Sequence, residues 1–396
     1  MNPVLVRHVL VLGALAALGP LAIDMYLPSF PRIAHDLATD EGAVQFSLVS
    51  FFVALALGQA FWGPLSDMYG RKRPLLVGLG LFVLTSLGCA LAASIEALTL
   101  LRFVQGLGAS ACMVISRAVI RDLYSGVDAA RLLSLVLLVL GVSPIIAPLF
   151  GSLLLQLVHW PALFLVFAAF GIACMALVAF LLEETQPPAR RVGAGFGAAF
   201  AIYRRLMIDR RFVGTVFVGG FAQAGMFAYL AGSPFVFMTL NGTTPVLYSV
   251  IFAVNAIGLI GGAQFNVRLI RAFGAEALIR CATAVYALAA CVLLVVTLLS
   301  VPGLPALVLP LFVLVSCMGL IMPPSAMLAI DPHPTIAGTA SSLIGTLQWT
   351  AAASSGVIVS LLFNGTALPM VGTIAVCALG AMVMARLILR PVPVPA

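Results

Sequence analysis

The chain has 396 residues, of which 63% are hydrophobic and only 8% are charged. A soluble domain carries about 25% charged residues, so the composition excludes ordinary soluble folds and indicates a polytopic membrane protein. The net charge of +7 does not require a nucleic-acid partner, because the basic residues sort by side of the membrane, as shown below. The seven cysteines fall in apolar runs without C-x-x-C pairs and the four histidines do not cluster, so no metal site or disulfide is predicted.

Twelve apolar runs are long enough to cross a bilayer as helices, which takes about 20 residues each. The runs are solid rather than alternating, which predicts helices and excludes a barrel. The first run is long for a cleaved signal and is interpreted as an uncleaved span. The approximate limits of the runs are 6–27, 43–65, 74–93, 97–120, 132–157, 161–182, 212–239, 246–267, 277–299, 304–329, 335–363 and 368–389.

These runs predict an all-α membrane protein made of two six-helix halves, residues 1–182 and 212–396. Residues 183–211 form the one long linker, which is rich in charge, Pro and Gly and includes a candidate amphipathic surface helix. Basic residues accumulate on the cytoplasmic side of membrane proteins, so both termini and the linker are predicted to be cytoplasmic. With this orientation only Arg32 lies outside and Arg102 lies within a span, and the other eighteen of twenty basic residues lie inside or at inner helix ends: Arg7, Arg71, Lys72, Arg73, Arg117, Arg121, Arg131, Arg190, Arg191, Arg204, Arg205, Arg210, Arg211, Arg268, Arg271, Arg280, Arg386 and Arg390.

Asp24, near the end of the first run, is the only acidic residue predicted to lie within the hydrocarbon. A charge at such a depth costs roughly 2.5–3.5 kcal/mol, and chains that keep one generally use it. Burial disfavours the charged form of a carboxylate, so Asp24 is a candidate to take a proton from outside and release it inside. The alternative is that Asp24 lies at the wet outer interface.

The connection after the second run reads GPLSDMYGRKRP over residues 63–74. Gly70 permits a tight turn, Asp67 offers an acceptor, and Arg121 and Asp122 at the inner end of the fourth run are candidate partners. Residues 263–280, after the eighth run, also place basic residues around a glycine but lack the aspartate. This echo indicates two parallel repeats, the layout of transporters whose site lies between the repeats.

Residues 63–73 resemble the signature of the major facilitator superfamily, G-x-L-(S/A)-D-x-x-G-R-(K/R), at every defining position. The resemblance implies a gating role for Asp67, Gly70, Arg71, Arg121 and Asp122. The alternative, a simple positive loop, explains the basic residues but not Asp67 and Gly70.

The fourth run begins with RFVQGLGA over residues 102–109, and the family pattern R-x-x-Q-G-x-G-A that it matches is associated with proton coupling. Arg102 and Gln105 are therefore assigned to coupling together with Asp24, whose level in the membrane Arg102 can share. The alternative is that Arg102 snorkels to the outer headgroups.

Small residues and prolines line one face of the fifth run, at spacings that bring them together on a helix. This stripe resembles the motif that marks antiporters within the superfamily, although a packing face could arise without that meaning. Its members are Gly141, Pro144, Pro148 and Gly151.

Seven further stretches resemble the Bcr/CflA family of drug exporters: AIDMYLPSFP (22–31), IRDLY (120–124), SPIIAP (143–148), HW followed by F (159–164), EETQPP (183–188), GMFAYLAGSPFVF (225–237) and AGTASSLIGT (337–346). The resemblance implies proton-driven export of drugs such as bicyclomycin and chloramphenicol. Polar and aromatic residues in the apolar runs are candidates for the drug cavity: Tyr26, Gln59, Gln105, Gln223, Phe227, Phe235, Asn255, Gln348 and Trp349.

The sequence therefore predicts a proton-coupled multidrug antiporter of the bacterial inner membrane, working by alternating access as a monomer. Drug and proton would compete for overlapping positions, with the proton gradient as energy source and no cofactor. A proton-coupled exporter or symporter of a small metabolite is the alternative. A membrane enzyme is disfavoured, because no nucleophile–base pair or Walker loop is found, and charges arranged for alternating access disfavour a channel.

Overall fold

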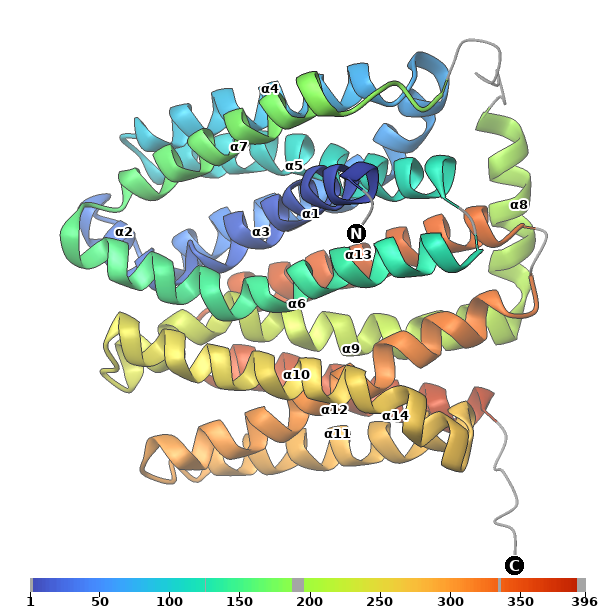
Figure 1. Cartoon of the computed structure of the whole chain (residues 1–396). Coiled ribbons are helices and arrows are strands. Elements are labelled where there is room, and N and C mark those ends of the chain that lie inside the picture. Colours follow the sequence, from blue (N-terminus) through green and yellow to red (C-terminus); the bar gives the residue numbers. More distant parts are fainter. Residues whose placement is uncertain (1–2, 125, 187–195, 334–335, 390–396) are drawn as a thin grey trace, which may run out of the picture. The chain divides into compact units, whose positions relative to one another are not determined.

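A computed structural model describes residues 3–124, 126–186, 196–333 and 336–389, and this part of the chain is almost entirely helical (Figure 1). Three of the predicted cytoplasmic basic residues, Arg190, Arg191 and Arg390, lie outside the described residues. The chain divides into two compact units. The first comprises Met1–Ala194 with Thr244–Val250, and the second Gly195–Thr243 with Ile251–Ala396.

In the first unit, α5 packs against both α3 and α4, while α1 packs against α5, α6 and α7. These contacts bring the first, second and fourth predicted runs together. The elements of this unit are α1 (Pro3–Asp24), η1 (Leu27–Ser29), α2 (Phe30–Asp36), α3 (Glu41–Tyr69), α4 (Lys72–Ala90), α5 (Ile95–Leu123), α6 (Gly126–Leu157) and α7 (Pro161–Leu181).

The first helix ends at Asp24, three residues before the predicted limit of 27. Pro28 and Pro31 follow, and neither can donate the backbone N–H that a continuing helix needs. The chain instead turns at Met25 and Tyr26 and re-enters a short 3₁₀ turn, with Pro28 in its first positions. Asp24 therefore lies at a break in the helix and not within it.

In the second unit, α9 packs against α12, α13 and α14. A short helix, α8, occupies part of the predicted linker and rests on the unit through Leu206, which is buried against Phe212 and Leu343. The elements of this unit are α8 (Phe196–Ile208), α9 (Arg210–Pro234), the π-helical η3 (Phe235–Leu240), α10 (Pro245–Phe273), α11 (Ala275–Leu298), α12 (Leu304–Ile330), α13 (Ala337–Leu361) and α14 (Leu368–Ile388).

Within the described residues, eleven helices are long and apolar enough to cross a membrane, which confirms an all-α membrane protein. The exception among the twelve predicted spans is the run 335–363, which holds α13. That helix carries many Ser, Thr and Gly residues together with Gln348, so it is less apolar than the others. Its polar content is typical of a helix that faces other protein segments or water.

The predicted similarity between the connections that follow the second and eighth runs is visible in the backbone. Gly70, between α3 and α4, has φ 86° and ψ 171°, and Gly274, between α10 and α11, has φ 81° and ψ 155°. A backbone in this region is essentially restricted to glycine. The glycine twelve residues before each turn also makes a close helix contact, Gly58 with Ser110 and Gly262 with Ser316. The two connections are thus built in the same way.

Candidate functional site

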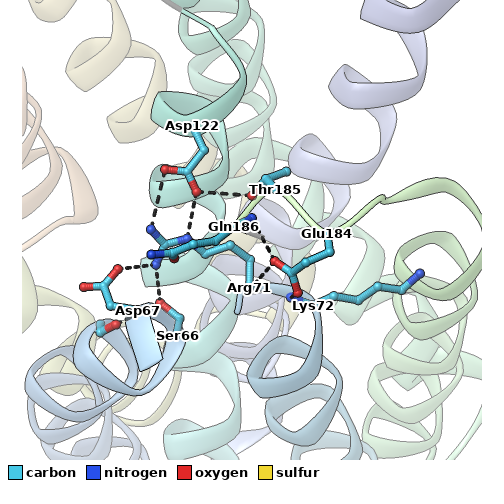
Figure 2. Close-up of polar contacts among 9 residues, drawn as sticks. Ser66, Asp67, Arg71, Lys72, Asp122, Glu184, Thr185 and Gln186 are labelled. Carbon is cyan, nitrogen blue, oxygen red and sulfur yellow. Dashed lines mark hydrogen bonds and ion pairs between the residues drawn. The ribbon is translucent and has the colours of Figure 1, made fainter. Parts of the chain in front are cut away.

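The turn between α3 and α4 places Arg71 in the centre of a polar cluster (Figure 2). The side chain of Arg71 donates through Nε to Asp122 Oδ2 at 2.8 Å, and through Nη1 to Asp67 Oδ1 at 2.5 Å and to Ser66 Oγ at 2.7 Å. Asp67 lies one helical turn before Arg71, whereas Asp122 comes from the last turn of α5. We call Ser66, Asp67, Arg71 and Asp122 the gate cluster.

Arg71 is only 3% exposed, so its charge depends on its partners. Burial by itself lowers the pKa of Arg71, but the hydrogen bonds and charges of Asp122 and Asp67 outweigh it and raise that pKa above its ordinary value. The guanidinium is therefore held charged between the C-terminal ends of α3 and α5. Such a buried ion pair fastens two helices together as long as both partners remain.

Arg121 was grouped with these residues from the sequence, yet it lies outside the gate cluster. Its side chain is exposed, and no hydrogen bond or ion pair joins it to the described part of the chain. Asp122 points toward Arg71 instead, because adjacent residues on a helix face different directions.

The segment that follows α7 also contacts the gate cluster. Glu184 accepts hydrogen bonds from the backbone N–H groups of Arg71 at 2.7 Å and Lys72 at 3.1 Å, and Thr185 donates to Asp122 at 3.2 Å. Figure 2 shows this segment beside the gate cluster. Its only signal in the sequence was the EETQPP stretch, which matched a family pattern without indicating a partner.

At the other end of α5, the Arg102 side chain is completely buried, which excludes snorkelling. Its Nη1 donates to Gln105 Oε1 at 2.6 Å and its Nη2 donates to the carbonyl oxygen of Ala22 at 3.1 Å. The guanidinium carbon lies 4.5 Å from the ring centre of Tyr26 and 4.4 Å from that of Phe51. Gln105 in turn donates to Ser86 at 2.6 Å. Aromatic faces and neutral oxygens thus replace the water that the cation has lost.

Asp24 is 4% exposed at the end of α1, so it is buried within the protein and does not lie on its surface. Arg102 reaches the same turn of α1 through the carbonyl oxygen of Ala22. Among the described residues, however, no hydrogen bond or ion pair joins Asp24 to Arg102. Arg102 therefore holds the end of α1 through the backbone and not through the Asp24 carboxyl group.

The stripe on α6 contacts the same region. The helix continues through Pro144 and Pro148, and Gly151 lies so close to α1 that a Cβ atom there would come within 2.5 Å of the Met25 carbonyl oxygen. Small residues allow such backbone approach. Gly151 thus packs directly against the residue that follows Asp24, which links the predicted antiporter motif to the predicted coupling site.

The cavity candidates fall in both units and are mostly buried. In the first unit, the Tyr26 hydroxyl forms a hydrogen bond of 2.8 Å with Ser47 Oγ. The buried Nε2 atom of Gln59 has no hydrogen-bond partner among the described residues. In the second unit, two pairs of aromatic rings are in contact: Phe227 with Trp349 (ring centres 5.2 Å apart) and Phe235 with Phe363 (4.8 Å). Asn255 donates a hydrogen bond of 3.0 Å to the Tyr229 hydroxyl. Gln348 lies beside Gly219, and Gln223 is 7% exposed.

No metal centre is found in the described ranges, since no three His, Cys, Asp or Glu side chains there are placed to share an ion. An apolar groove of about 460 Å³ lies between α11 and α12, and none of the cavity candidates lines it. The two polar centres of the first unit, around Arg71 and around Arg102, therefore remain the candidates for function.

Comparison with known proteins identifies the family. A model described as Major Facilitator Superfamily matches residues 12–357. The Uncharacterized MFS-type transporter YdgK of Bacillus subtilis (strain 168) is 38% identical over 85% of this chain and 84% of its own. The Bicyclomycin resistance protein homolog of Haemophilus influenzae is 33% identical over 93% and 92%. A crystal structure of a D-xylose-proton symporter, 16% identical, shares the fold with a TM-score of 0.78 over 98% of both chains. The chain therefore belongs to the Major Facilitator Superfamily of membrane transporters, and its bicyclomycin-resistance relative confirms the resemblance to the Bcr/CflA family.

Proposed function

We propose that this transporter exports small drugs of the bicyclomycin and chloramphenicol type in exchange for protons. The observation that carries the proposal is the presence in the first unit of two buried charged side chains, one acidic and one basic. Asp24 is 4% exposed and Arg102 is fully buried, and within the described residues neither has an ion-pair partner. A carboxyl group in such a place is expected to serve as a functional site.

In the proposed cycle, Asp24 takes a proton from the outside and releases it inside. Arg102 is fixed by Gln105, Ala22 and the aromatic rings, so it cannot move to neutralise Asp24. The charge state of Asp24 therefore changes the field at the break in α1, and an apolar drug and a proton compete there. The proton gradient supplies the energy, without a cofactor.

The gate cluster is proposed to close the cytoplasmic side while the outer side is open. Arg71 fastens α3 to α5 through Asp122 in the orientation predicted from the basic residues. Alternating access rocks two six-helix halves about a central site, and the gate cluster, which lies wholly within the first unit, is proposed to hold the α3 and α5 ends of that unit together in the closed state.

Transport into inverted membrane vesicles tests the direction and the coupling. Radiolabelled chloramphenicol should enter vesicles that contain the full chain faster when their lumen is acidified, and a protonophore should abolish the difference. Faster loss of the drug from acidified vesicles would indicate a symporter and contradict the proposal. A bacterium that lacks its own drug pumps should also survive higher concentrations of at least one drug in a test panel when it expresses this chain than when it does not.

A further inference from the structure

The segment after α7 returns to the start of α4 and binds it with a carboxylate. Glu184 Oε1 accepts the N–H of Arg71 at 2.7 Å, and Glu184 Oε2 accepts the N–H of Lys72 at 3.1 Å. The N–H of Gln186 also donates to Glu184 Oε1, at 3.0 Å, so the carboxylate also orders its own segment. Figure 2 shows both oxygens of Glu184 facing the helix end.

This contact supplies what the local sequence of α4 lacks. The first N–H groups of a helix have no partner within the helix, and the usual remedy is a Ser, Thr, Asp or Asn at the N-cap. Here the N-cap is Arg71, whose guanidinium has only donors and cannot accept from helix N–H groups; it donates instead to Asp122 and Asp67. Glu184 caps the helix from a distant part of the chain, with a negative charge at the positive end of the helix dipole.

The same segment also holds the acceptor of the gate cluster. Thr185 Oγ1 donates to Asp122 Oδ2 at 3.2 Å, and this is the oxygen that accepts from Arg71 Nε at 2.8 Å. Two successive residues therefore fix the two sides of one ion pair: Glu184 holds the backbone of Arg71, and Thr185 holds the carboxylate of Asp122. Lys72 adds a bond from Nζ to the carbonyl oxygen of Ala179 on α7 at 2.8 Å.

On the basis of the export cycle above, we propose that Glu184 and Thr185 are positioning residues of the gate. They hold Arg71 and Asp122 at bonding distance, so that release of residues 183–186 and separation of the gate cluster are a single event.

The first test is hydrogen exchange of the backbone amides of Arg71 and Lys72 in the purified full chain. Glu184→Gln removes the charge and one of the two acceptors, and Glu184→Ala removes both. Hydrogen bonds to charged groups lead us to expect amide exchange about 10- to 100-fold faster in Glu184→Ala and an intermediate increase in Glu184→Gln. The matched control is Glu183→Gln, since the adjacent Glu183 side chain is 83% exposed and pairs only with Arg7 at 3.3 Å among the described residues.

Equal exchange in the Glu183 and Glu184 variants would overturn the proposal. This measurement needs no substrate, so it decides the role of Glu184 even if the chain exports none of the drugs tested. Failure of the proposed function would appear separately, as an absence of transport by the parent chain.

The second test asks whether Glu184 and Thr185 act through the gate. Glu184→Gln and Thr185→Val should each lower kcat for chloramphenicol export several-fold, while KM stays within about twofold. Thr185→Ser, which keeps the hydroxyl group, should have the same kcat as the parent chain. Neither substitution should reduce kcat further in an Arg71→Ala background, where the group they position is gone. Independent, multiplicative losses in that background would show that the segment acts elsewhere and would contradict the proposal.

Discussion

Arg102 Nη2 donates a hydrogen bond of 3.1 Å to the carbonyl oxygen of Ala22, two residues before Asp24 at the end of α1. A buried cation on α5 is thereby tied to the backbone of the turn that carries the buried carboxyl group. In the proposed cycle, a change in the charge of Asp24 acts on the same turn that Arg102 holds through Ala22.

Replacement of Arg102 by Lys should destabilise the protein although the charge is kept. An ammonium cannot reproduce the planar contacts with Tyr26 and Phe51 while also serving both Gln105 and Ala22. One buried acceptor left without a donor costs about 1–3 kcal/mol, so thermal unfolding in detergent should occur at a lower temperature. Arg73→Lys, at an exposed position, is the control, and equal melting temperatures for both variants would argue against this role of Arg102.

Gly70→Ala should weaken the gate through the backbone alone. The φ of 86° and ψ of 171° at Gly70 cost a non-glycine residue about 1–3 kcal/mol, which displaces Arg71 from Asp122. We expect slower chloramphenicol export at unchanged protein level. Gly80→Ala is the matched control, because a Cβ at that α4 position meets nothing within 4 Å. A fully active Gly70→Ala variant would mean that the turn geometry is not needed.

Asp122→Asn should loosen the gate cluster at its most buried ion pair. The substitution leaves the Arg71 guanidinium, 3% exposed, with one carboxylate on the half-exposed Asp67, and loss of one partner of a buried pair typically costs about 3–5 kcal/mol. A cysteine-reactive probe applied from the cytoplasmic side should then label engineered cysteines near the inner ends of α3 and α5 more quickly. Asp331→Asn, at an exposed position, should leave the labelling rate unchanged.

Gly151→Ala tests the contact between α6 and the break in α1. The added methyl would lie 2.5 Å from the Met25 carbonyl oxygen and 2.9 Å from its Cγ, so one of the two helices must shift. Overpacking of this kind costs about 1–3 kcal/mol. We expect reduced coupling, seen as less drug accumulated per unit of proton gradient, whereas Gly261→Ala, which meets nothing within 4 Å, should behave as the parent. Unchanged coupling would show that the small-residue stripe on α6 is not needed for coupling.

Much of the gate could be predicted because its members lie close together in the sequence or in a strong motif. Gly70, Arg71 and Asp67 are within one turn of each other, and Asp122 was suggested by its place at an inner helix end. Arg121 could not be separated from Asp122 in this way, since helix rotation decides which neighbour faces Arg71. The role of Glu184 could not be predicted from the sequence, because its contact joins residues more than a hundred positions apart and depends on the path of the chain after α7.

The coupling site was predicted in part. The common level of Asp24 and Arg102 stays a prediction, whereas the burial of both charges followed from their positions in their spans. The partners of Arg102 did not, because a cation held by aromatic rings and a backbone carbonyl leaves no charge pattern in the sequence. The end of α1 at Asp24 was not predicted, because the apolar run continues to Leu27, beyond the end of the helix.

The most direct test of the account compares Asp24→Asn with the parent chain in liposomes across which a proton gradient is imposed. The parent is expected to accumulate chloramphenicol against its concentration gradient. The Asp24→Asn variant should lose this accumulation yet still exchange labelled for unlabelled drug, while Glu96→Gln, at an exposed position of α5, should act as the parent. Uphill accumulation by Asp24→Asn equal to that of the parent would contradict the assignment of Asp24 as the proton-coupling residue.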